Sequence, residues 1–127
     1  MATQQEGFDY NGKVAGEDLS SSQFLAVYIE TDGDVNLAAT TGRHSVGILQ
    51  NAPGSGEACS VRVTGLSLAM YGGTVDEGDA LTCETTTARL ITTTTATHYV
   101  LARALTAGAD GDIREVLITH EGREAAA

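Results

Sequence analysis

The chain has 127 residues, which suits a single domain whose modest core needs neither disulfides nor a metal. Its 17 acidic residues against 7 basic ones give a formal net charge of −10, which argues against nucleic acid and anionic membranes as partners. A partner with basic patches, or one bound through apolar and backbone contacts, fits this charge better. The polar start of the chain predicts no signal peptide, and no apolar run is long enough to span a bilayer.

The first thirteen residues are expected to form an extended N-terminal arm. Two aromatic residues, Phe8 and Tyr10, stand in a polar stretch and are followed by the turn signal Asn11-Gly12. Such an arm can be a frayed terminus or a latch that docks on a neighbour, and the residues leave both interpretations open.

From residue 14 to residue 120 the pattern predicts an all-β domain. Threonine and valine suit pleated strands, and most of the 15 glycines fall between apolar runs, where turns are expected. The first strand is expected over residues 23–30 and ends in the hairpin turn Asp32-Gly33. The other expected strands are residues 35–39, 46–50, 58–64, 80–84, 89–95, 99–105 and 113–119, and residues 121–127 are expected to be a frayed tail.

Residues 58–64 alternate, with Val61 and Val63 on one face of the strand. Gly65 interrupts this alternation, which indicates a bulge or sharp bend, and Leu66 and Leu68 are expected to resume the same apolar face.

The chain also contains an internal repeat, with units at about 15–64 and 72–119. The segment that starts at His44 aligns with the one that starts at His98, and each leads through a small-residue loop to a strand. The period is about 54 to 56 residues, and two copies are too few for a solenoid. We therefore expect two similar β units that close one small barrel or sandwich.

The order of these segments resembles bacteriophage capsid cement, or head-decoration, proteins. The similar stretches run in order as AGEDLSSSQFLAVYIETDGDVNLAA, SVGILQNAPGSGEACSVRVTGLSLAM, GGTVDEGDALTCE and HYVLARALTAGADGDIREVLI, within residues 15–119. Each motif alone is a generic turn followed by a strand, so the order carries the likeness. The chain departs from the family at Ser22, where glycine is usual, and in the threonine-rich stretch at residues 85–97.

The resemblance implies a non-enzymatic structural protein without a cofactor, on the exterior of the virion and assembled in the host cytoplasm. It implies binding to the major capsid protein, a clamping action on neighbouring capsid subunits, and a homo-oligomer, with a trimer favoured over a dimer. Nucleic acid and membranes are not expected partners. For contacts to the capsid or between copies we expect Phe8 and Tyr10 in the arm, and Arg89 and Ile91 at an exposed strand edge.

The residues capable of catalysis or metal binding form no familiar pattern. His44 and His98 are interpreted as surface residues at strand entries, and Cys59 and Cys83 as buried thiols, although a disulfide between them stays open. A Cys83–His98 pair and weak calcium binding at Asp32 or Asp110 lack the signatures that such sites need. The alternative function is a small carbohydrate- or ligand-binding β module.

Overall fold

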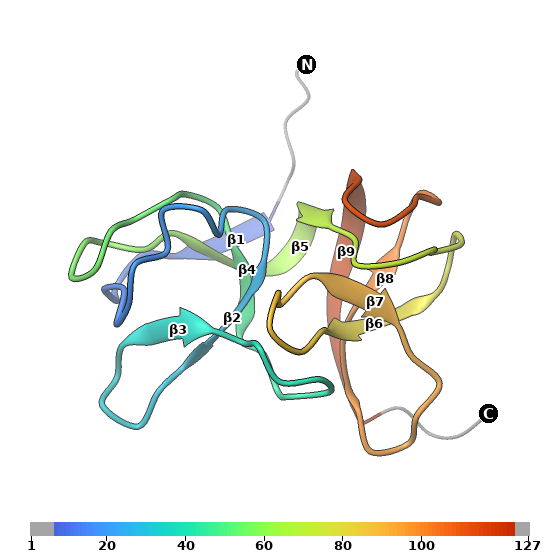
Figure 1. The fold of residues 1–127 in the computed structure, drawn as a ribbon, viewed down its shortest axis with the longest axis horizontal. Coiled ribbons are helices and arrows are strands. Elements are labelled where there is room, and N and C mark those ends of the chain that lie inside the picture. The colour runs from blue at the N-terminus through green and yellow to red at the C-terminus, as the bar shows by residue number, and fades with distance from the viewer. Residues whose placement is uncertain (1–6, 124–127) are drawn as a thin grey trace.

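The computed structural model describes residues 7–123, and these form a curled antiparallel sheet of nine strands (Figure 1). The strands are β1 (Gly7–Tyr10), β2 (Ala26–Ile29), β3 (Val35–Leu37), β4 (Gly47–Leu49), β5 (Val61–Met70), β6 (Ala80–Cys83), β7 (Leu90–Thr92), β8 (Tyr99–Ala104) and β9 (Ile113–Arg123). The prediction of an all-β fold is confirmed. Within residues 7–123 there is no helix that could cross a membrane.

The strand order shows the same arrangement twice. The hydrogen-bonded path is β3-β2-β4-β5-β9-β8-β6-β7, and β1 pairs with β5 outside this path. The order β3-β2-β4-β5 in one half therefore corresponds to β7-β6-β8-β9 in the other. The long strands β5 and β9 meet in the middle and join the halves into one sheet.

Hydrogen bonds outside the strands recur at corresponding positions of the two halves. Ala15 N–H donates to the Glu57 carbonyl at 2.9 Å, and Tyr71 N–H donates to the Asp112 carbonyl at 2.8 Å. In both halves a glycine at positive φ returns a hydrogen bond to the same residue. The Gly56 N–H donates to the Ala15 carbonyl, and the Gly111 N–H donates to the Tyr71 carbonyl. Similar turn chemistry at nearly the same spacing thus produces two similar β units.

The buried side chains form two clusters. The smaller one lies within the first half and is made of Ala15, Leu19, Val27, Val35, Leu49, Cys59 and Val61. The larger one draws on both halves, and its largest fully buried side chain is Tyr71, whose hydroxyl donates to the Thr106 carbonyl at 2.7 Å. Because this cluster is shared, the halves bury apolar surface together and are expected to unfold together.

Beyond Gly65, strand β5 buries a different set of alternating side chains from the one that its sequence suggests. The strand continues through Gly65, which has φ +96°, so the predicted interruption is a bend inside one long strand. Beyond this bend the small residues Ser67 and Ala69 are fully buried, whereas Leu66 and Leu68 are half-buried on the other face. The expectation that both leucines share the apolar face of Val61 and Val63 is wrong.

The described parts of the predicted arm and of the predicted tail form strands. Within the predicted arm, Gly7–Tyr10 is strand β1 and pairs with β5, while residues 1–6 lie outside the described range. Strand β9 continues to Arg123, so the predicted tail begins within a strand, and residues 124–127 also lie outside the described range. In both places a long partner strand, β5 or β8, supplies backbone hydrogen bonds that local sequence does not reveal.

Candidate docking site at strand β1

Strand β1 presents two large aromatic side chains on an edge strand. It pairs with the first half of β5, with Phe8 opposite Thr64 and Tyr10 opposite Val61. Phe8 is 62% exposed and Tyr10 is 41% exposed, which makes Phe8 the most exposed large apolar side chain among the described residues. A folded protein gains nothing from holding aromatic rings in water, so an ordered, exposed pair is a candidate docking site.

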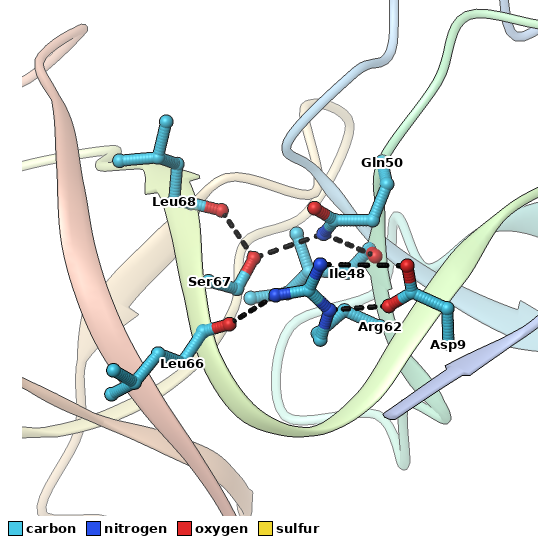
Figure 2. Close-up of polar contacts among 7 residues, drawn as sticks. All are labelled: Asp9, Ile48, Gln50, Arg62, Leu66, Ser67 and Leu68. Atoms are coloured by element: carbon cyan, nitrogen blue, oxygen red, sulfur yellow. Dashed lines mark hydrogen bonds and ion pairs between the residues drawn. The ribbon is translucent and has the colours of Figure 1, made fainter. Parts of the chain in front are cut away.

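An ion pair between Asp9 and Arg62 holds β1 on β5 (Figure 2). The two residues lie directly opposite each other, and the Arg62 side chain is only 12% exposed. The guanidinium also donates to the Leu66 carbonyl, beyond the bend of β5 (Figure 2). One side chain therefore joins β1 to both sides of the bend and fixes the position from which Phe8 and Tyr10 project.

Gly7 allows β1 to approach β5 this closely. A Cβ at this position would lie 2.4 Å from the Thr64 carbonyl oxygen and 2.4 Å from Cδ of Arg62. Because the first of these contacts is with backbone, a larger residue has to displace β1. Glycine here is explained by close packing under the Arg62 side chain.

The inner side of the bend is filled by a polar contact instead of large side chains (Figure 2). The Gln50 amide donates to the Ser67 hydroxyl at 2.9 Å and to the Ile48 carbonyl at 3.0 Å. The Ser67 hydroxyl in turn donates to the Leu68 carbonyl at 2.8 Å. These bonds satisfy the fully buried Ser67 and join β4 to the second half of β5.

His120, on β9, contacts β5 at the position where β5 carries an extra residue relative to β1. The register between β1 and β5 shifts at Val63, and the Val63 carbonyl accepts a hydrogen bond from Nε2 of His120 at 2.6 Å. A carbonyl only accepts, so Nε2 carries the proton, and in the neutral ring Nδ1 accepts from the Tyr99 hydroxyl at 2.9 Å. His120 has φ +48°, and it lies where the β8–β9 register is also irregular.

The four residues expected to make contacts are not brought together. Phe8 and Tyr10 lie on β1, whereas Ile91 lies on β7 and Arg89 directly before it, beyond β9, β8 and β6 along the path. Arg89 forms an ion pair with Asp110 at 3.0 Å, and Ile91 is half-buried, with its Cγ2 3.0 Å from where a Cβ on Gly72 would lie. Strand β7 is a terminal strand, but the Leu90 carbonyl already accepts a hydrogen bond from Gly72.

The Cys83 thiol and the His98 ring in the described region have different hydrogen-bond partners. Cys59 and Cys83 are free, buried thiols, and burial raises the pKa of Cys59. The Cys83 thiol donates to the Thr40 carbonyl at 3.1 Å, while His98 bonds the Thr93 hydroxyl through Nδ1 at 2.8 Å. No three His, Cys, Asp or Glu side chains among residues 7–123 lie close enough together to hold a metal ion.

Sequence reasoning found the aromatic pair but missed the residues that position it. Asp9 and Arg62 are 53 residues apart, and only the β1–β5 register reveals that they meet. A signal was present, since Arg62 stands between two valines of a strand and Asp9 between two aromatics of the arm. A single charge within each apolar stretch is typical of a cross-strand pair.

An ion pair at the far end of β9 supplies a pH-dependent part of the stability. Hydrogen bonding from Arg103 lowers the pKa of Glu121, and the closer of the two contacts is 2.7 Å. A depressed pKa stabilises the fold above the unfolded value, near 4.5, and the contribution disappears as the pH falls through the lower folded value. Both side chains are about one-third exposed, so screening limits the pair to about 0.5 kcal/mol.

We therefore expect Glu121→Gln to lower the free energy of unfolding at about pH 7 and to have a smaller effect at about pH 3, because protonation of Glu121 removes the ion pair as the pH falls. Urea unfolding of both proteins at the two pH values measures this difference. Glu77→Gln, which removes an exposed carboxylate outside this ion pair, is the control. An equal loss at both pH values would contradict the assignment.

The fold defines an all-β protein with a curled sheet built from two β units and an aromatic edge strand. It is similar to a solved structure, the head fibre gp8.5 N base of bacteriophage phi29, with a TM-score of 0.68 and 15% sequence identity. The likeness covers 93% of this chain and 98% of that chain, and at this identity it establishes a shared fold. No family model and no curated protein sequence matches the chain.

Proposed function

We propose that this chain is a structural protein of a bacteriophage head that binds the outer surface of the capsid and clamps neighbouring major capsid subunits. The observation that carries the proposal is the shared fold with a phage head fibre base over nearly the whole of both chains. The order of sequence motifs similar to capsid cement proteins points in the same direction and was obtained independently of the fold. The proposed partner is the major capsid protein, and the proposed assembly is a homo-oligomer, with a trimer favoured.

The surface chemistry supports adhesion as the mode of action. Strand β1 offers two exposed aromatic rings on a backbone that β5 and the Asp9–Arg62 pair already hold in place. A pre-ordered docking element loses little conformational entropy on binding, so more of its apolar contact appears as affinity. An oligomer that carries one such element per copy contacts several capsid subunits at once, and weak single contacts then add up to tight attachment.

Binding to heads that lack this protein tests the proposal. Purified full-length protein is added to such heads at increasing concentration, and occupancy is measured by co-sedimentation and by electron microscopy of the particles. We expect saturable binding at regular positions on the outer surface, and greater resistance of the heads to heat. Binding that does not saturate would reject the capsid function, and selective retention on a glycan array would favour the carbohydrate-binding alternative.

A further inference from the structure

The outer face of the central sheet carries large aliphatic side chains that are exposed or half-buried, and of these Met70 also packs against the larger core cluster. Cross-strand rows on this face place Leu66 beside Leu117 and Met70 beside Ile113. Leu105 comes directly after β8, and its N–H donates to the Glu115 carbonyl. Ile113, Leu105 and Leu117 are 42%, 39% and 38% exposed, while Leu66, Leu68 and Met70 are half-buried.

The inner face of β5 carries small residues, whereas β9 adds the larger Val116 and Ile118 to the same face. Ser67 and Ala69 are fully buried, so β5 itself packs inward through small side chains and directs Leu66 and Leu68 outward. Figure 2 shows this alternation on β5, where Ser67 points toward Gln50 and the side chains of Leu66 and Leu68 point away from it. A strand with leucine outside and serine inside is the reverse of the usual pattern for a sheet with one solvent face.

Charge distinguishes this sheet from the rest of the protein. Residues 61–70 and 99–123, which contain β5, β8 and β9, hold four arginines and four carboxylates and therefore carry no net charge. The remaining residues hold 3 basic and 13 acidic side chains, so they carry the entire net charge of −10. Arg103–Glu121 and Arg114–Asp112 are ion pairs within the neutral region.

We propose that a second copy of this chain docks on the outer face of β5, β9 and β8. Two copies with ten negative charges each repel wherever their acidic surfaces meet, so self-association favours the neutral apolar face. A strongly basic partner would instead be drawn to the acidic remainder. Residues 1–6 and 124–127 offer one large apolar side chain, Met1, so their composition does not supply a cover of matching chemistry.

These rows contain two charged side chains: Arg103, which lies opposite Leu117 and is ion-paired with Glu121, and Glu115, which lies opposite Leu68 and is half-buried. When a second copy covers this face, in a dimer or in a trimer, the half-buried Glu115 carboxylate loses its remaining water, and this desolvation weakens the interface. Glu115→Gln is therefore expected to tighten self-association, and weaker association of this variant would count against the proposed face.

The decisive experiment measures self-association in free solution, so it does not rest on the proposed function. Sedimentation velocity of the full-length protein over a range of concentrations gives the dissociation constant for the wild type, Leu117→Glu and Ile29→Glu. Ile29 is the matched control, because it is also 38% exposed on a strand but lies on β2, away from this face. We expect Leu117→Glu to weaken association by about 30-fold or more, the effect of losing an interface hot spot, and Ile29→Glu to leave it unchanged.

Folding of each variant is checked by circular dichroism, and Leu105→Gln, directly after β8, provides a second, milder substitution on the same face. A wild type that stays monomeric at every concentration overturns the proposal, as does equal weakening by Leu117→Glu and Ile29→Glu. If the wild type is monomeric and Leu117→Glu instead abolishes binding to heads, the face belongs to the capsid. The second-copy assignment and the proposed homo-oligomer are then wrong, while the proposed binding to the capsid stands.

Discussion

Replacing both Phe8 and Tyr10 with alanine is expected to weaken binding to undecorated heads by about 30-fold to several hundred-fold. Complete burial of a large apolar side chain contributes roughly 1.5–3 kcal/mol, and these rings are already partly covered, so about 1–2 kcal/mol each remains for docking. The rings are exposed at 62% and 41%, so their removal is expected to change the free energy of unfolding by less than about 0.5 kcal/mol. Head-binding isotherms and urea unfolding together measure both effects.

The matched control for this prediction is Ile29→Ala, which shortens an exposed apolar side chain on β2, away from β1; Ile29 is 38% exposed, close to the 41% of Tyr10. It is expected to leave head binding unchanged. If the double variant binds heads as tightly as the wild type does, β1 is not the docking element, whatever the remainder of the surface contributes.

A second variant separates the aromatic side chains from their placement. Gly7→Val keeps Phe8 and Tyr10 but puts a side chain where a Cβ would lie 2.4 Å from the Thr64 carbonyl oxygen, so β1 must leave β5. We expect this variant to lose most of the affinity although both rings are present, because they must then be ordered again on binding. This substitution is a sharper test than deletion of residues 1–13, which would also expose an edge of β5.

The largest expected loss of stability follows the substitution Gly47→Ala. Gly47 lies in β4 between β2 and β5, and a Cβ there would be 2.2 Å from the Arg62 carbonyl oxygen and 2.9 Å from a methyl group of Val61. The clash is with the backbone of β5, so the strands have to separate at a cost of about 2–3 kcal/mol. For a domain of this size that corresponds to a drop in Tm of roughly 10 °C.

Gly73→Ala is the control for this substitution, because a Cβ at Gly73 would meet no atom within 4 Å. We expect its free energy of unfolding to match the wild type or to rise by up to about 0.5 kcal/mol, since alanine restricts the unfolded chain. Thermal unfolding followed by circular dichroism gives both values. Equal midpoints for Gly47→Ala and the wild type would show that β4 can move away from β5 at little cost.

Gly47 also connects stability to the candidate docking site. The carbonyl that its Cβ would strike belongs to Arg62, whose side chain forms the ion pair with Asp9. Displacement of this backbone is therefore expected to loosen β1 as well, so Gly47→Ala should weaken head binding more than its effect on stability alone predicts.

The sequence by itself determined the secondary structure class, the positions of most strands and the repeat. These features depend on short-range physics: alternation with period two, turn residues such as Asp32-Gly33, and equal spacing of equal turns. The same short-range reasoning singled out Phe8 and Tyr10, because aromatic residues in a polar segment stand out locally. It placed β1 in an arm, because the strand that pairs with it lies more than fifty residues further along the chain.

Only the tertiary structure decided which face of β5 is buried and which residues hold β1. Along β5 both sets of alternating side chains are compatible with a core, leucines on one side and serine with alanine on the other. In the packed structure the small set is buried, and the Gln50 amide donates to the Ser67 hydroxyl, a contact that leucine could not make. Backbone pairing across the sheet is set by such long-range packing, which no local pattern encodes.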